Sequence, residues 1–350
     1  MKILSPQRFT KTTINRVILN NILIDYVYGH HEILIDFINR YSQYKNFYYS
    51  LSKLNNYQIV ELFNKARRKC LLLFSIMLNF YCNAKCFQCC FKEQKNSKEI
   101  ISSEMLLDLL YQSNQLGLET IYVAGQGEPF LDNKLYTIFD FARTYNKKVV
   151  VFTNGLIFEN NPKLVSKLRE YPVWIYYKLW SLNKDKNSNL LGLKEIKFNY
   201  INLEINNHTY NIPEGLNILL KELGPKRVGV ETVILKENYK EIENCIIPLV
   251  EDLQIAFYLE KLIWKEYYSN FNIEFSESFN RYLVRKQCER LIYMINLQND
   301  GFVTPCLNTH PNIDTDYKNI MKNTNLFDSR FSSESAAKAR YSIDKCICSQ

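Results

Sequence analysis

Short apolar runs alternate with amphipathic segments over residues 69–260. Six runs of strand length lie at 71–78, 120–125, 148–155, 173–179, 227–235 and 255–260. Between them, apolar residues recur with the spacing of one helix face. Strands separated by helices build right-handed βαβ units and a parallel sheet. We therefore predict an α/β fold, a partial (β/α)6 barrel whose functional groups gather at the C-terminal ends of the strands.

Residues 1–68 have a different pattern and carry no recognisable chemical motif. Helix-like spacing of apolar residues in 16–28 and 57–69 predicts a mostly helical N-terminal extension. Two roles fit this segment. It is either a module that recruits a substrate or a helical cap that packs on the open barrel.

The composition is that of a globular protein, because 47% of the 350 residues are hydrophobic and 23% are charged. The longest apolar run, 71–78, is too short to cross a bilayer, and the N-terminus lacks the apolar core of a secretory signal. We therefore expect a cytoplasmic protein without a membrane partner. The net charge of +8 could favour an acidic ligand or RNA. The basic residues are nevertheless dispersed and cluster only at 65–69, so no nucleic-acid partner is expected.

Eight of the ten cysteines fall into two groups. The first group is Cys82, Cys86, Cys89 and Cys90, and the second is Cys288, Cys306, Cys346 and Cys348. Disulfide frameworks are typical of small secreted domains, whereas grouped cysteines in a cytosolic chain more often bind metal or carry out redox chemistry. The two remaining cysteines, Cys70 and Cys245, stand alone and are predicted to be core residues.

Cys82, Cys86 and Cys89 lie on one short loop directly after the first predicted strand. Three thiolates can hold three irons of a [4Fe–4S] cluster and leave the fourth iron open to a ligand. A structural zinc site is the alternative, although such sites usually draw their ligands as two pairs and no second pair lies nearby in sequence. Cys90 is expected to pack rather than bind, because a fourth thiolate would occupy the open position.

The Cys-x3-Cys-x2-Cys loop at this place in the chain resembles the signature of the radical S-adenosylmethionine (SAM) superfamily. The segments that follow resemble those of the same superfamily and occur in the same order. The second strand ends in a turn similar to the Gly-Gly-Glu-Pro turn of that family, the third ends in Thr-Asn-Gly, and two more resemble its fourth and fifth strands. These segments are 124–129, 153–155, 176–183 and 228–238. The resemblance covers roughly residues 70–350 and implies the partial barrel of the radical SAM type.

The resemblance also implies a SAM site. Its residues would be Gly127, Glu128, Asn154, Ser181 and Lys178. The glycine and glutamate would hold the methionine amino group, and the serine would bind the SAM carboxylate or ribose. Each has an ordinary alternative: the glutamate could cap the following helix, and the Thr-Asn-Gly stretch could be a simple turn.

Two further residues bear on this site. Gln88 stands where the family usually has an aromatic residue that packs on adenine, and Phe87 precedes it. Glu231 lies in an apolar strand and points into the barrel if it shares a face with Val233. A buried charge needs a partner, so Glu231 is expected to bind cofactor, substrate or a basic residue.

The second cysteine group includes a predicted hairpin. Residues 298–306 contain the turn pair Asp300-Gly301 and end at Cys306. Four thiols suffice for a closed cluster or for a four-cysteine zinc site. The arrangement resembles the twitch domain, a shortened SPASM domain, and implies an auxiliary [4Fe–4S] cluster. The terminal Cys-x-Cys spacing departs from that pattern.

The resemblance predicts three domains: the extension at 1–68, the barrel at 69–270 and the cluster domain at 271–350. It implies an enzyme that accepts an electron from a flavodoxin or ferredoxin, cleaves SAM to a 5′-deoxyadenosyl radical and abstracts hydrogen from a peptide or protein. The alternatives are a small-molecule dehydrogenase or rearrangement enzyme, and a non-catalytic cluster-binding protein on a degenerate barrel.

Overall fold

A computed structural model describes most of the N-terminal three quarters of the chain and short stretches beyond it. The described residues are 9–86, 89, 101–125, 127–193, 198–261, 294–297, 303–304, 325–331 and 334–341. The chain forms two compact units, each built from separate segments. The first unit comprises 1–8, 78–97 and 123–285, and the second comprises 9–77, 98–122 and 286–350. The predicted domain boundaries stay predictions.

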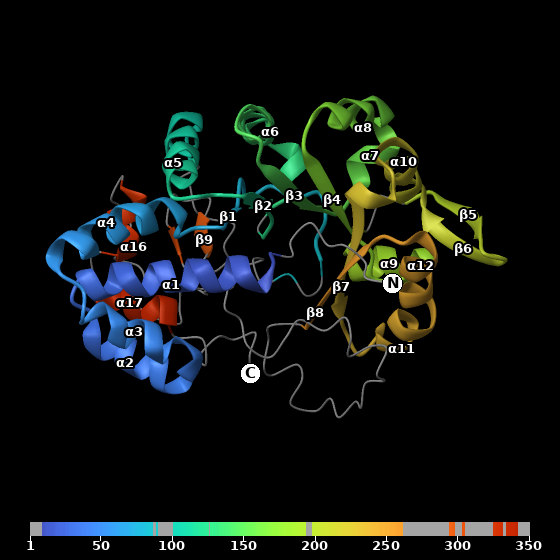
Figure 1. Ribbon diagram of the computed structural model, residues 1–350. Helices are drawn as coiled ribbons and strands as arrows, with labels where there is room; N and C mark the ends of the chain where they lie inside the picture. Colours follow the sequence, from blue (N-terminus) through green and yellow to red (C-terminus); the bar gives the residue numbers. More distant parts are fainter. Residues whose placement is uncertain are drawn as a thin grey trace. The chain divides into compact units, whose positions relative to one another are not determined.

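The first unit contains four parallel strands, of which three have mostly buried side chains and the last, β8, has several half-buried ones. They are β3 (Lys148–Thr153), β4 (Val173–Lys178), β7 (Val228–Ile234) and β8 (Ala256–Lys261). Near-continuous apolar sequence is what a strand covered on both faces requires. The longer helices of this unit are α6 (Lys134–Thr144), which precedes β3, and α9 (Lys184–Leu190), α10 (Glu214–Leu223) and α12 (Ile247–Leu253), and shorter ones are α7 (Leu156–Asn160), α8 (Pro162–Lys167) and α11 (Tyr239–Glu241) (Figure 1).

The second unit contributes the other strands of the sheet. They are β1 (Leu73–Ile76), β9 (Met294–Leu297), β10 (Val303–Thr304) and β2 (Thr120–Val123), whose last residue is counted with the first unit. β10 runs antiparallel to β9, with Val303 opposite Leu297, as the predicted hairpin requires. Its turn residues, Asp300 and Gly301, lie outside the described residues. β9 also pairs in parallel with β1, which the sequence did not reveal.

The strands follow the order β10-β9-β1-β2-β3-β4-β7-β8 in one sheet. Apart from β10 they are parallel, which confirms the predicted α/β fold class. The six predicted strands are all present, and each is shorter than or displaced by about a residue from its apolar run. β9 is an added strand. Its four residues are too short a run for a sequence pattern to identify.

Helices of the second unit confirm the predicted helical extension. They are α1 (Lys11–Val27), α2 (His31–Arg40), α3 (Lys45–Leu51), α4 (Asn56–Ala66) and, from later segments, α5 (Ser103–Gln115), α16 (Leu326–Phe331) and α17 (Glu334–Tyr341) (Figure 1). Side chains cap several of these helix starts: Thr10 Oγ1 accepts from the Thr13 amide at 3.1 Å, Asn55 forms a capping box with Gln58, and Ser102 Oγ accepts from the Met105 amide at 3.1 Å. No helix in the described segments is long and apolar enough to cross a bilayer.

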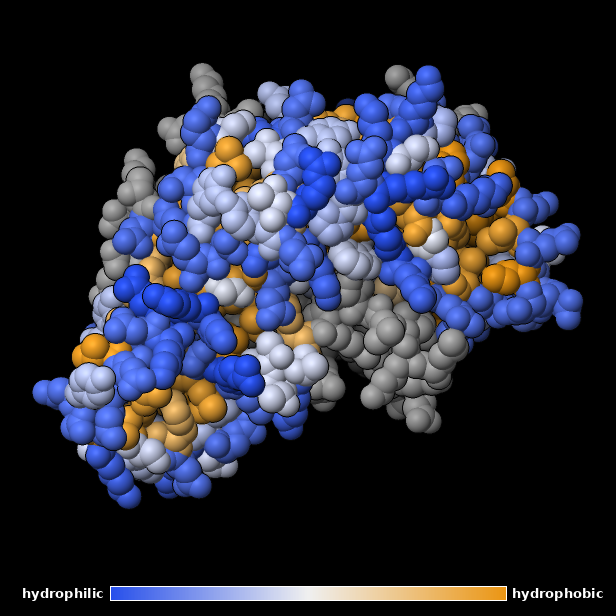
Figure 2. All heavy atoms as spheres, turned by 45° about the horizontal axis from the view of Figure 1, so that its top comes forward, coloured by the Kyte–Doolittle hydropathy of each residue, from blue (hydrophilic) through white to orange (hydrophobic). Residues whose placement is uncertain are grey.

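The N-terminal helices bury a core of their own and still expose several large apolar side chains. The buried set includes Ile22, Ile24, Leu34 and Phe37, and the exposed set includes Val27, Ile35, Tyr49, Tyr57 and Val60. On the face shown in Figure 2, hydrophobic residues form separate patches among hydrophilic ones. Scattered apolar residues of this kind are usual on protein surfaces. They do not decide between the recruitment and cap roles of this segment.

A hairpin between α9 and α10 was not predicted. Its strands are β5 (Tyr200–Ile205) and β6 (His208–Pro213), joined by Asn206 and Asn207, whose φ angles are +50° and +63°. Asparagine is one of the few residues that adopts this conformation readily, and such pairs are typical of two-residue hairpin turns. The Asn-Asn pair between alternating apolar residues was the signal that could have revealed it.

Asp252 of α12 holds this hairpin in place. Its carboxylate accepts hydrogen bonds from Tyr210 Oη at 2.6 Å, His208 Nδ1 at 2.9 Å and Asn206 Nδ2 at 3.1 Å. These bonds, that of Tyr210 first, lower the pKa of Asp252 to about 2. The pKa of Asp252 in the folded protein lies below its ordinary value. The ionised carboxylate therefore stabilises the folded protein at neutral pH, and this stabilisation is lost as the pH falls towards 2.

We expect the stability difference between the wild type and Asp252→Asn to shrink as the pH is lowered from 6 towards 2. Both proteins would be followed by thermal unfolding across this range. The exposed Glu204→Gln substitution on the same hairpin serves as the control and should show no such trend. A gap between wild type and Asp252→Asn that is independent of pH would contradict the role of this carboxylate.

Candidate cofactor-binding site

The three predicted cluster ligands follow β1 on one loop. Cys82 is exposed, Cys86 and Cys89 are half-buried, and all three are free thiols. Burial, the largest effect, and the neighbouring thiols of Cys82 and Cys89 together raise the pKa of the Cys86 thiol to about 12, although Lys178 opposes the rise. Metal binding at Cys86 would therefore have to displace the proton of this thiol.

Hydrogen bonds from three elements hold the loop. The Glu128 amide donates to Tyr81 O at 2.7 Å, Asn154 Nδ2 donates to Asn83 Oδ1 at 2.7 Å, and the Lys85 amide donates to Leu191 O at 3.0 Å. Each bond joins the loop to the end of a different strand or helix of the first unit. A loop fixed in this way presents its thiols from a preorganised backbone.

These thiols fit an open cluster site in their chemistry. Cys82 and Cys86 lie close enough to Cys89 for the charge of one thiolate to affect the others. Among the described residues, no set of three His, Cys, Asp or Glu side chains is already gathered as a metal cage. Three soft thiolate ligands on one loop match iron–sulfur ligation with one iron left open.

The turn after β2 requires its glycine. Gly127 has φ +79°, and a Cβ there would lie 2.0 Å from Asn79 Oδ1 and 2.5 Å from Asn79 O. Asn79 follows β1 and donates from Nδ2 to Glu128 O at 3.3 Å. The backbone of this turn is thus pressed against the residue that leads into the cysteine loop, which only glycine permits.

Gly127→Ala is expected to lower the free energy of unfolding by about 3 kcal/mol, because a strained backbone and a steric clash with Asn79 add together. Gly29→Ala is the matched control. Gly29 also has a positive φ, +82°, but a Cβ there would meet nothing within 4 Å. It should cost only about 1–2 kcal/mol. Chemical denaturation measures both, and equal losses would show that the contact with Asn79 is unimportant.

Glu128 is buried, and its carboxylate is shared between two turns. Oε1 accepts from Thr153 Oγ1 at 2.6 Å, Oε2 accepts from the Asn154 amide at 2.9 Å, and the Phe130 amide lies 3.4 Å from Oε1. Burial raises the pKa of Glu128, and the Thr153 and Asn154 hydrogen bonds oppose that rise. Glu128 therefore caps the short helix at Pro129–Leu131, as the simpler interpretation holds, and also joins the ends of β2 and β3.

Asn154 connects this carboxylate to the cysteine loop. Its amide hydrogen bonds to Glu128, while its side-chain Nδ2 reaches Asn83 Oδ1 at 2.7 Å and lies 3.8 Å from Cys82 Sγ. Gly155 follows with φ +75°, and a Cβ there would overlap the ring of Tyr177, so both the backbone conformation and the lack of space favour glycine. The predicted turn at the end of β3 thus lies beside the first cluster ligand.

Lys178 ends β4 in register with Glu231 of β7. Its Nζ lies 3.9 Å from Glu231 Oε2, so the predicted basic partner of Glu231 is present. Burial alone would lower the pKa of Lys178, but Glu231, followed by Cys86, Glu128 and Cys82, raises it above the ordinary value. Lys178 is therefore a cation whose field reaches both the carboxylates and the cysteine loop.

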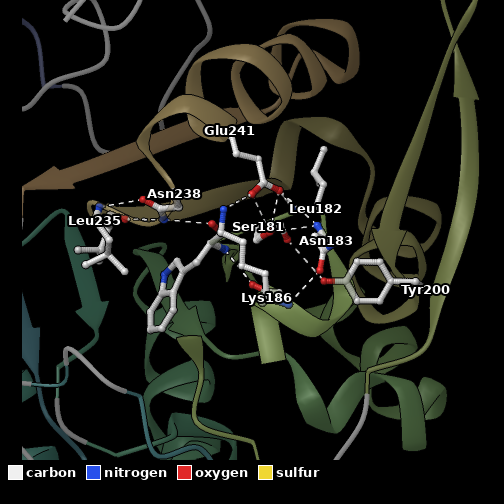
Figure 3. A network of polar contacts seen from close by, with 11 residues as sticks. Ser181, Leu182, Asn183, Lys186, Tyr200, Leu235, Asn238 and Glu241 are labelled. Carbon is white, nitrogen blue, oxygen red and sulfur yellow. Dashed lines mark hydrogen bonds and ion pairs between the residues drawn. The ribbon is translucent and has the colours of Figure 1, made fainter. Parts of the chain in front are cut away.

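Ser181 lies in a separate polar network, seen in Figure 3. Its hydroxyl is fully buried and lies 2.7 Å from Glu241 Oε1. The same carboxylate accepts from the Leu182 amide at 2.6 Å, the Asn183 amide at 3.2 Å and Lys186 Nζ at 3.0 Å. Burial alone would raise the pKa of Glu241, but these bonds, that of Ser181 first, lower it. A SAM carboxylate would have to replace Glu241 at this position.

Several predicted residues lie outside the described part of the chain. They are Phe87, Gln88, Cys90, Cys288, Cys306, Cys346 and Cys348. Of the two isolated cysteines, Cys70 is buried and Cys245 is half-buried. The burial of Cys70 agrees with its predicted place in the core, whereas Cys245 is only partly buried and is not a core residue.

Three residues of this region were missed from sequence. Asn79 and Asn83 flank the start of the cysteine loop, and Glu241 lies one turn after β7. A polar residue directly after an apolar strand run was the available signal for Asn79. No local pattern marks Asn83 or Glu241, because each acquires its role from a residue more than 50 positions away.

Comparison with known proteins agrees with this geometry. Residues 76–246 match the family model of the Radical SAM superfamily. This stretch, just under half of the chain, holds the cysteine loop and most of the strands that surround it, and the match agrees with the resemblance of that loop to the radical SAM signature.

A curated relative and two solved structures are similar to the chain. The putative peptide biosynthesis protein YydG of Bacillus subtilis is 26% identical over 166 residues, which cover 45% of this chain and 52% of that protein. The chain thus matches about half the length of this relative. SuiB of Streptococcus suis bound to S-adenosylmethionine is 16% identical with a TM-score of 0.54, covering 92% of this chain and 83% of SuiB. SuiB bound to its precursor peptide SuiA has the same score, with 88% and 80% covered. At this identity the two structures establish the fold alone.

Proposed function

We propose that this protein is a radical SAM enzyme that acts on a peptide or protein substrate in the cytoplasm. The observation that carries the proposal is the cysteine loop, held at the strand ends by Glu128 and Asn154 within the matched domain. Cys82, Cys86 and Cys89 would hold the three protein-bound irons of a [4Fe–4S] cluster.

When bound, cluster and SAM supply one-electron cleavage of the sulfonium to methionine and a 5′-deoxyadenosyl radical, which abstracts hydrogen from the substrate. The protein contributes binding and charge. Gly127 and Glu128 would bind the methionine ammonium, and Asn154 would keep their turn aligned with the loop. Ser181 and Lys178 would bind the carboxylate or ribose. A flavodoxin or ferredoxin would deliver the electron.

The test is SAM cleavage by anaerobically reconstituted protein. Cys86→Ala is expected to abolish release of 5′-deoxyadenosine after dithionite reduction, because the cluster would lose one of its three protein ligands. Cys245→Ala, which removes a half-buried thiol outside the loop, is the control and should retain release. Zinc in place of iron, or cluster-loaded protein that never cleaves SAM, would leave the non-catalytic binding protein as the better interpretation.

Two relatives support a peptide as substrate. YydG is described as a putative peptide biosynthesis protein, and SuiB has been solved with its precursor peptide SuiA. A small-molecule dehydrogenase or rearrangement enzyme is the second candidate, because the same half-barrel fold serves many substrates. Incubation with peptides encoded beside this protein, followed by mass spectrometry, distinguishes the two.

We also propose an auxiliary [4Fe–4S] cluster bound by Cys288, Cys306, Cys346 and Cys348. Four thiolates suffice to close such a cluster, and four thiolates also suit zinc. Reconstituted protein should contain about eight irons per chain, as two clusters of four require. Substitution of Cys306 and Cys348 should halve this content. Four irons together with one zinc would contradict the auxiliary cluster.

A further inference from the structure

The carboxylate of Glu231 is buried without a full set of partners. Glu231 is 7% exposed, and its Oε2 has no hydrogen-bond partner within the described part of the chain. Lys178 Nζ lies 3.9 Å from Oε2, which is beyond hydrogen-bond distance. A buried acceptor left in this state is costly, and such groups commonly mark a place where a ligand or water binds.

Aromatic rings line the same face of the sheet. Tyr258 is in register with Glu231, Tyr176 precedes Lys178 by two residues, and Phe152 is in register with Tyr176. Side chains in register or two residues apart point to one side of a sheet. The ring centroids of Phe152 and Tyr176 are 5.0 Å apart, and that of Tyr258 is 5.4 Å from Phe152. The Glu231 carboxylate therefore lies on the same face of the sheet as these three aromatic rings.

The charges near this carboxylate are unbalanced. Glu128 and Glu231 are both buried carboxylates, and the field of Lys178 reaches both of them and the thiols of Cys82 and Cys86. Among the described residues, Lys178 is the cation that these two buried carboxylates share. A second cation would balance them, and Oε2 of Glu231, which accepts no hydrogen bond within the described part of the chain, is the acceptor for it.

We propose that Glu231 and the three rings form a binding site for a cationic group of the substrate, an ammonium or a guanidinium. The carboxylate pairs with the charge, while the rings pack on the aliphatic stem and attract the cation through their faces. The inference rests on the proposed function, because the ligand is the substrate of that enzyme. SAM also carries an ammonium group, so the test must separate the two sources.

Two small probes isolate the charge. N-acetyl-lysine amide carries an ammonium, and N-acetyl-norleucine amide has nearly the same stem without it. Their binding to the full-length, reconstituted protein with SAM present would be measured by ligand-observed NMR. We expect the wild type to prefer the lysine probe by about tenfold or more, since a buried charge-assisted hydrogen bond is worth at least that factor. Glu231→Gln should remove the preference, and its loss of lysine-probe binding should be clearly larger than any loss of SAM affinity that follows from the changed ion pair with Lys178.

Matched variants guard the interpretation. Glu204→Gln alters an exposed glutamate of the same unit and should retain the preference. Glu231→Asp keeps the charge and should retain a weakened preference, which provides a test if Glu231→Gln does not fold. Circular dichroism establishes folding for each variant.

Four results would overturn the inference: no preference in the wild type, an unchanged preference in Glu231→Gln, no preference in folded Glu231→Asp, or a loss of SAM affinity in Glu231→Gln as large as the loss of lysine binding. The last result would assign Glu231 to the cofactor. SAM cleavage is assayed in the same preparations. Cleavage without a preference defeats this inference alone, whereas a preference without cleavage defeats the proposed function and leaves a cation-binding site.

Discussion

Replacement of Asp25 by alanine is expected to lower the free energy of unfolding by about 3–5 kcal/mol, because it leaves buried guanidinium groups without their carboxylate. Asp25 is fully buried in α1. It accepts hydrogen bonds from Arg340 Nη2, from Tyr341 Oη at 2.7 Å and from His30 Nδ1 at 3.0 Å. These contacts join the N-terminal helices to α17 across more than 300 residues of sequence.

A second buried arginine increases the expected loss. Arg330 donates from Nη1 to Met294 O at 3.1 Å and from Nη2 to Asn21 Oδ1 at 3.2 Å, and both of these acceptors are uncharged. Burial first, and then the nearby charge of Arg340, lower the pKa of Arg330 to about 10. The charge of Asp25 therefore acts on two buried arginines, Arg340 by direct contact and Arg330 from nearby.

Chemical denaturation with a double-mutant cycle tests this prediction. Asp36→Ala changes an exposed aspartate of α2 and should cost no more than about 0.5 kcal/mol. In an Arg340→Met background, Asp25→Ala should cost less than in the wild type, because one of the stranded charges is gone. If the cost in both backgrounds is equal, Asp25 is not paired with Arg340 in solution.

Glu128→Gln is expected to weaken SAM binding by about 10- to 100-fold. The amide nitrogen of glutamine cannot accept a hydrogen bond, so either Thr153 Oγ1 or the Asn154 amide loses its acceptor in a buried site. A stranded buried donor costs about 1–3 kcal/mol, which corresponds to this range. The turn would then shift, and with it the Asn154 side chain that reaches the cysteine loop.

Equilibrium dialysis with SAM measures the effect in reconstituted protein. Glu119→Gln, an exposed change next to the start of β2, is the control and should leave affinity unchanged. Thr153→Val removes only one donor and should have a smaller effect than Glu128→Gln. Folded Glu128→Gln protein with wild-type affinity would show that Glu128 is structural and is not part of the SAM site.

The sequence by itself determined the helices and strands of the barrel and the order of the functional residues along the chain. Apolar runs with helical segments between them specify buried parallel strands because both patterns are local along the chain. The cysteine loop is equally local, since Cys82, Cys86 and Cys89 lie within eight residues. Strands of this kind end at one edge of a sheet, which is why the turns at Gly127 and Asn154 could be placed near that loop.

Only the tertiary structure decided which side chains meet. Glu128 is bound by Thr153 and Asn154, 25 and 26 positions away, and Ser181 is paired with Glu241, 60 positions away. Periodicity carries no information about such distances, because they are set by how whole strands and helices pack. The contact of Asp25 with Arg340 is the extreme case, at 315 positions. A charged residue in an apolar segment indicates from the sequence that it needs a partner, but only the packing of the folded chain decides which residue that partner is.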